Sequence, residues 1–177
     1  MANLLTTARL ILIVPVCWAI LQPNLMPPWS LLLLLVLAVA SDYFDGIVAR
    51  HLGTASPRGQ LFDHGTDCCF VSAALTSGAI TGLIPWLLPP LVVIAFSQYV
   101  LDSHFLHRQK TLRMSTLGKW NGVLYFVPLF LLAAAQLPFS PEAIRLLEQT
   151  TTLLCGLLII STIASIIDRV LAPSAWQ

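Results

Sequence analysis

Residues 42–67 read DYFDGIVARHLGTASPRGQLFDHGTD and place four aspartates inside or at the edges of two successive apolar segments. Asp42 and Asp45 are three residues apart, and Asp63 and Asp67 are four residues apart. Both spacings put side chains on one face of an α-helix. Ionisable groups in apolar segments are costly unless they have partners. The stretch therefore predicts two neighbouring helices, each of which presents two carboxylates to a shared polar site.

The composition indicates that lipid surrounds most of the chain. Of the 177 residues, 57% are hydrophobic and 10% are charged, whereas a soluble domain carries about 25% charged residues. The length suits one domain, 1–177. The net charge of +1 gives no reason to expect a nucleic-acid partner.

Six segments are long and apolar enough for transmembrane helices of about 20 residues each. They are 5–22, 29–50, 60–83, 86–106, 117–137 and 147–171. With both termini on one face of the membrane, that face receives every Lys and Arg except Arg145. Cytoplasmic loops are rich in these residues. The predicted fold is therefore an all-α integral membrane domain with six transmembrane helices and both termini in the cytoplasm.

Four aspartates that lie close together need cations to stay ionised. Arg50 and Arg58 are the nearest basic residues in sequence, and their two charges do not balance four carboxylates. Carboxylate oxygens are preferred ligands of Mg²⁺ and Mn²⁺, and two ions that share carboxylates suit displacement at phosphorus. We therefore expect two Mg²⁺ or Mn²⁺ ions at the cytoplasmic ends of the second and third spans, with these ligands: Asp42, Asp45, Asp63 and Asp67.

Two other interpretations of the aspartates fit the sequence less well. Helix capping would explain one aspartate at a helix end, but it does not explain four at helical spacing. A cation transporter would carry its carboxylates along a path across the membrane. The four aspartates instead cluster at one end of two successive segments, beside glycines and an arginine.

The pattern Asp-x-x-Asp-Gly-x-x-Ala-Arg at 42–50, followed by Gly-x-x-x-Asp-x-x-x-Asp at 59–67, resembles the signature of the CDP-alcohol phosphatidyltransferase family. Every signature position is present. The opening Asn3-Leu4-Leu5-Thr6-x-x-Arg9 also resembles that of short bacterial members such as phosphatidylglycerophosphate synthases. The resemblance covers nearly the whole chain. It implies a bacterial inner-membrane protein whose active site faces the cytoplasm, and it implies that the chain can form homodimers.

The resemblance also implies a role for each matched residue. Asp42, Asp45 and Asp63 match metal ligands, and Asp67 matches both a ligand and the general base for the acceptor hydroxyl. The residues that match the CDP-binding positions are Gly46, Ala49, Arg50 and Gly59. Small side chains let a nucleotide lie against a helix, and an arginine offers a planar fork to phosphate. The implied reaction transfers a phosphatidyl group from a CDP-linked donor, CDP-diacylglycerol, to an alcohol by direct displacement of CMP.

His64 makes the local string Phe-Asp-His-Gly-Thr-Asp at 62–67, which resembles the eukaryotic choline and ethanolamine phosphotransferases. A histidine at this place can accept the proton of the acceptor hydroxyl. It can equally hydrogen-bond to Asp63 and orient that ligand. The string adds an alternative activity, that of a CDP-aminoalcohol:diacylglycerol phosphotransferase.

The fourth span and the residues after it bear on the acceptor alcohol. Short family members that use a phosphorylated acceptor tend to carry arginines in this span, whereas this chain has Gln98 and Asp102 one helical turn apart. Such a polar wall suits an uncharged or cationic alcohol, although Asp102 can equally form a polar contact between helices. Arg113 and Lys119 follow and are candidate phosphate contacts, although Lys119 could also extend to the lipid headgroups. The sequence leaves the acceptor open.

Overall fold

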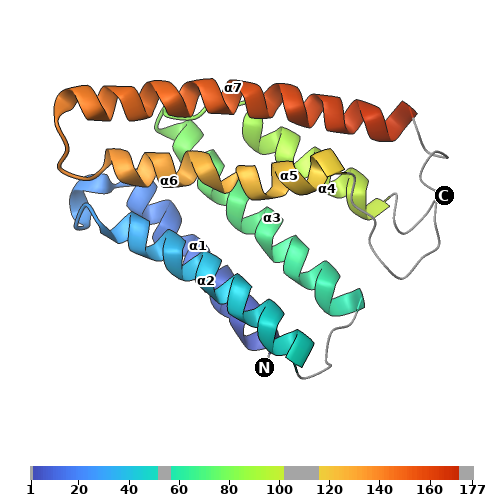
Figure 1. The fold of residues 1–177 in the computed structure, drawn as a ribbon. Coiled ribbons are helices and arrows are strands. Elements are labelled where there is room, and N and C mark those ends of the chain that lie inside the picture. Colours follow the sequence, from blue (N-terminus) through green and yellow to red (C-terminus); the bar gives the residue numbers. More distant parts are fainter. Residues whose placement is uncertain (1, 52–56, 102–115, 172–177) are drawn as a thin grey trace.

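The structure is a computed structural model that describes residues 2–51, 57–101 and 116–171 (Figure 1). Among these residues there is no strand, which confirms the all-α class. The helices are α1 (Ala2–Leu21), α2 (Ser30–His51), α3 (Pro57–Ile80), α4 (Leu88–Leu101), α5 (Thr116–Leu124), α6 (Phe126–Ala135) and α7 (Pro141–Leu171), with a short 3₁₀ helix, η1 (Pro23–Leu25), after α1.

The helices form a bundle in which α2 and α3 link two groups. α1 packs against α2 and α3, while α7 packs against α4, α5 and α6. α3 also contacts α4 and α6, and α2 contacts α6. Both helices therefore connect the two groups, and Figure 1 shows α3 running between them. Phe70 of α3 stacks on Phe126 of α6 with ring centroids 6.1 Å apart. The buried core includes Val16, Leu35 and Leu129 and therefore draws on both groups.

Side-chain hydrogen bonds attach α7 to α4, to α5 and to Tyr125. These are Gln98 to the carbonyl of Ile166 (3.1 Å), Ser161 to Asn121 (2.7 Å) and Tyr125 to Thr162 (2.7 Å). Buried polar groups need partners because water does not reach them. The polar side chains of α4 and α5 thus serve helix packing at these positions.

The predicted fifth span is divided into α5 and α6 at Tyr125. Pro128 lies in the first turn of α6 and is buried. Proline has no backbone N–H, and its ring clashes with the carbonyl four residues earlier, which here belongs to Leu124. The amide of Tyr125 still donates to the carbonyl of Asn121 at 2.9 Å, so helical hydrogen bonding continues as far as Tyr125. The proline therefore interrupts the helix only locally.

The last helix begins at Pro141, six residues before the predicted start of the sixth span. Ser140 caps it, since the amide of Ala143 donates to its hydroxyl at 3.3 Å. Proline is favoured in the first turn of a helix, where its missing N–H has no partner to lose, and serine is a preferred N-cap. Pro141 lies between the predicted fifth and sixth spans, and it starts the last helix instead of belonging to the connection.

Two helical stretches within the described residues are long and apolar enough to cross a membrane, Leu117–Ala135 and Pro141–Val170. Three further apolar stretches are shorter, Thr7–Leu21, Ser30–Phe44 and Leu88–Gln98. α2 and α3 carry charged residues where they approach each other in sequence, which shortens their apolar parts. The six-span topology therefore remains a prediction.

The end of α3 depends on two glycines. Gly82 has a φ of +78°, in the left-handed region that favours glycine, and its amide donates to the carbonyl of Ala79 at 3.0 Å. Gly78 lies where the chain turns back onto α3. A Cβ atom there would lie 2.8 Å from Cδ1 of Ile84 and 3.3 Å from Cδ1 of Leu132 in α6. The absence of a side chain at Gly78 lets these residues pack against α3.

We expect Gly78→Val to destabilise the protein by about 1–3 kcal/mol, the usual cost of overpacking a well-filled core. Gly156→Val is the matched control, because the same substitution in α7 places its Cβ where no atom lies within 4 Å. Thermal unfolding of both variants in detergent measures the difference. Equal melting temperatures for the two variants would contradict the packing argument.

Candidate metal centre and its arginine

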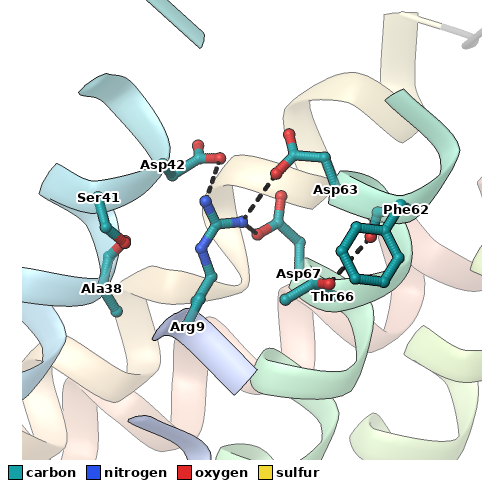
Figure 2. Close-up of polar contacts among 8 residues, drawn as sticks. All are labelled: Arg9, Ala38, Ser41, Asp42, Phe62, Asp63, Thr66 and Asp67. Atoms are coloured by element: carbon teal, nitrogen blue, oxygen red, sulfur yellow. Dashed lines mark hydrogen bonds and ion pairs between the residues drawn. The ribbon is translucent and has the colours of Figure 1, made fainter. Parts of the chain in front are cut away.

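Asp42 of α2 and Asp63 and Asp67 of α3 meet at one site (Figure 2). Each offers one carboxylate oxygen, and these oxygens lie within 4.8 Å of one another. Asp63 and Asp67 are one turn apart on α3, as their spacing predicted. Three carboxylates from two helices make a donor set that suits a hard divalent cation. The described residues could therefore hold a metal ion here.

Arg9 of α1 lies at the centre of this group and contacts all three carboxylates. Its Nη2 donates to Oδ1 of Asp42 at 2.7 Å, and its Nη1 donates to Oδ1 of Asp63 at 3.3 Å. Nη1 also donates to Oδ1 of Asp67. One guanidinium thus joins side chains from α1, α2 and α3, using the fork geometry that suits arginine to several carboxylates at once.

The burial of the group is uneven. The side chain of Arg9 is 1% exposed, whereas those of Asp42, Asp63 and Asp67 are 46%, 34% and 28% exposed. Figure 2 shows the second oxygens of Asp42 and Asp63 pointing away from the guanidinium. The arginine therefore closes the inner side of the site, and the carboxylates line a side that a ligand can reach.

Sequence reasoning missed the role of Arg9. Arg50 and Arg58 are the nearest basic residues in sequence, but Arg9 pairs with the aspartates although it lies 33 to 58 residues from them. The side chains of Arg50 and Arg58 lie outside the described part of the structure. Arg9 had a signal of its own, since a single arginine interrupts the apolar first span. Charged residues in such segments usually have partners in the bundle.

Other predicted site residues are placed by their backbone alone. Asp45 and the CDP-binding candidates Gly46, Ala49 and Arg50 lie in the part of α2 that follows Asp42; their side chains are outside the described residues. Gly59 lies in the first turn of α3, one turn before Asp63, and is exposed. Asp102 and Arg113 fall in 102–115, outside the described ranges.

The remaining polar candidates near the aspartates differ in their surroundings. His64 is half-buried in α3, between Asp63 and Asp67 in sequence. Thr66 is buried, and its hydroxyl donates to the carbonyl of Phe62 at 2.9 Å. The hydroxyl of Ser41 similarly donates to the carbonyl of Ala38 at 2.8 Å. These two hydroxyls are satisfied by their own helices, so they give no sign of a binding role.

The two candidates on the α4 and α5 side take different positions. Gln98 donates to the backbone of α7, so the described contact of this residue is structural. Lys119 is exposed on α5, which fits either a phosphate contact or a headgroup contact. Its neighbour Asn121 is 3% exposed and accepts a hydrogen bond from Ser161.

Comparison with known proteins gives two curated relatives. A CDP-diacylglycerol–glycerol-3-phosphate 3-phosphatidyltransferase of Cereibacter sphaeroides is 31% identical over 108 residues, which cover 59% of this chain and 49% of the relative. A CMP-forming cardiolipin synthase of Streptomyces coelicolor is 35% identical over 97 residues, which cover 52% of this chain and 44% of the relative. The matched regions thus span about half the length of each relative.

No solved structure gives a significant match to the chain. Residues 1–168, however, match the protein family described as CDP-alcohol phosphatidyltransferase. That range includes all three helices that form the aspartate site, together with the signature at 42–67. The resemblance found in the sequence is confirmed, and the chain belongs to the CDP-alcohol phosphatidyltransferase family.

Proposed function

We propose that this chain is a single-domain membrane enzyme of phospholipid synthesis. It transfers a phosphatidyl group from CDP-diacylglycerol to the hydroxyl of an alcohol and releases CMP. The observation that carries the proposal is the convergence of Asp42, Asp63 and Asp67 within a complete family signature. The name of one relative specifies CDP-diacylglycerol and that of the other specifies CMP formation, which supports this choice of donor and product.

The proposed enzyme spans the cytoplasmic membrane six times, with α5 and α6 together forming the fifth span. The reversal of direction between successive long helices supports this topology (Figure 1). Large apolar side chains are exposed on several helices, among them Trp18, Leu33, Val93 and Leu153. A large exposed apolar surface is unfavourable in water and favourable against lipid chains. Both termini and the aspartate site then face the cytoplasm.

The aspartates provide the chemistry that the transfer needs. Mg²⁺ or Mn²⁺ bound by Asp42, Asp45, Asp63 and Asp67, two ions in all, would neutralise the pyrophosphate of the donor and make CMP a better leaving group. Gly46, Ala49 and Gly59 leave room for the cytidine and pyrophosphate beside α2 and α3, and Arg50 binds phosphate oxygens.

Asp67 acts as the general base in this proposal. It accepts the proton of the acceptor hydroxyl, whose oxygen then attacks the β-phosphorus of the donor while the bond to CMP breaks. His64 is close to Asp63 in the same helix, and we assign it to orienting that ligand. Arg113 and Lys119 are the residues that would contact the phosphate of a phosphorylated acceptor.

One sequence feature favours a second candidate activity. The string around His64 is like that of the choline and ethanolamine phosphotransferases, which suggests transfer from a CDP-aminoalcohol to diacylglycerol. The two candidates differ in which substrate carries CDP. Offering each donor separately to the purified protein distinguishes them.

We expect the purified protein to release CMP from CDP-diacylglycerol when Mg²⁺ or Mn²⁺ and an acceptor alcohol are present. A panel of glycerol 3-phosphate, inositol, choline and phosphatidylglycerol would identify the acceptor. Excess EDTA should stop the release, because the carboxylates alone cannot neutralise the pyrophosphate. CMP release at an undiminished rate in EDTA would contradict the metal-dependent mechanism. CMP release from CDP-choline but not from CDP-diacylglycerol would favour the second candidate.

Asp67→Asn should reduce turnover more than about tenfold, a rise of more than about 1.4 kcal/mol in the activation barrier. Asparagine has nearly the same size but cannot accept the proton. Asp168→Asn is the control, since Asp168 is exposed near the end of α7. Rates of CMP release are compared at saturating Mn²⁺, with CDP binding measured separately. A variant that binds CDP and retains more than a tenth of the rate would show that Asp67 is not the base.

His64→Ala should lower kcat less than about 100-fold, with a loss that shrinks as the metal concentration rises. This follows if His64 orients Asp63 and its removal weakens metal binding. A lost proton acceptor would instead lower kcat by roughly 10²–10⁴ at every metal concentration. Steady-state rates over a wide range of Mn²⁺ concentrations separate the two cases, and rescue by added imidazole would support the proton-acceptor role.

A further inference from the structure

The side chain of Arg9 has no part in the proposed transfer, yet it makes the most extensive polar contacts at the site. It is almost completely buried and touches three carboxylates on two other helices. An arginine that only marked the membrane surface would extend its charged end into water. Arg9 turns inward instead, so its charge acts on the aspartates.

The negative charges of the aspartates need a nearby cation even in the metal-free protein. In their ionised forms the three described carboxylates contribute −3 and Arg9 contributes +1, which leaves a formal charge of −2. Carboxylates that lie this close repel one another strongly where water is partly excluded. Arg9 removes a third of the negative charge and contacts all three groups. It can therefore keep the aspartates together before a metal ion arrives.

We propose that Arg9 is an internal counter-ion that keeps the carboxylates together in the metal-free protein and lowers their affinity for a divalent ion. This inference rests on the proposed metal-dependent function. Two cations that neutralise the same carboxylates repel each other, so each weakens the binding of the other. Such coupling is reciprocal: if Arg9 weakens metal binding, the metal must reduce the contribution of Arg9 to stability.

The opposite sign would follow if Arg9 only oriented the ligands. Removing an orienting residue leaves the carboxylates badly placed and weakens metal binding. Removing a counter-ion leaves an excess of negative charge and strengthens metal binding. The direction of the change in metal affinity therefore separates the two roles, and a purely structural contact would change stability without changing the response to metal.

The experiment uses the full-length protein in detergent and the variants Arg9→Gln and Arg9→Lys. Arg145→Gln is the matched control, since Arg145 is exposed near the start of α7. Mn²⁺ affinity is measured by the electron paramagnetic resonance of free Mn²⁺. Thermal unfolding is measured in EDTA and in saturating Mn²⁺. Neither measurement requires substrate or turnover.

We expect Arg9→Gln to bind Mn²⁺ about tenfold more tightly. The repulsion between a single positive charge and a divalent ion about 6 Å apart lowers the binding constant about tenfold even at the permittivity of water. In EDTA its melting temperature should fall by about 5 °C or more, and Mn²⁺ should restore most of the loss. Arg9→Lys keeps the charge and should bind Mn²⁺ within about threefold of the wild type. Arg145→Gln should match the wild type in both measurements.

Mn²⁺ affinity that is unchanged or weaker in Arg9→Gln would overturn the inference. If Arg9→Gln folds only when Mn²⁺ is present throughout purification, that result supports it. If Arg9→Gln does not fold in either condition, the Arg9→Lys variant tests the counter-ion role. Weakened Mn²⁺ binding in Arg9→Lys overturns that role. Preserved Mn²⁺ binding with lower stability in EDTA supports it. A wild-type protein that binds no Mn²⁺ would instead contradict the proposed function itself.

Discussion

The ion pairs between Arg9 and the three aspartates are the constraint on which the rest of the structure depends. They join α1, α2 and α3 through one buried guanidinium. Because the guanidinium is almost completely buried, its charge is stable only when its partners are in place. The rotation of each of the three helices about its own axis is therefore fixed by charge as well as by packing. A helix turned by one residue would remove at least one partner from the buried arginine.

The pairing of the aspartates was predictable from sequence because it rests on local spacing. Asp63 and Asp67 lie on one helix, and the nearby Asp42 follows from the expectation that charged groups in apolar segments share a site. Arg9 was not predictable in the same way, since its partners are 33 to 58 residues away and the helix packing decides which charges meet. The start of α7 differs for another reason: the apolar pattern placed the sixth span at 147–171, whereas Ser140 and Pro141 together favour a helix start six residues earlier.

The two groups of helices use their polar side chains differently. α1, α2 and α3 carry the charged site, and α4 to α7 carry hydrogen bonds that hold helices to one another. Asn121 and Gln98 illustrate the second kind, because both bond to α7. Composition alone does not separate these two uses of polar residues in apolar helices. The surroundings of each side chain do, since Asp42 is substantially exposed and Asn121 is buried.

The distance in sequence between Arg9 and its partners has a consequence for biosynthesis. The ribosome makes Arg9 33 residues before Asp42 and 58 residues before Asp67. At about 5–20 residues per second, the last partner is completed roughly 3–12 seconds after the arginine. During that interval the nascent first helix carries a charge without its full set of native counter-charges. Arg9 lies near the start of α1, where its side chain can remain at the water interface until α3 is made.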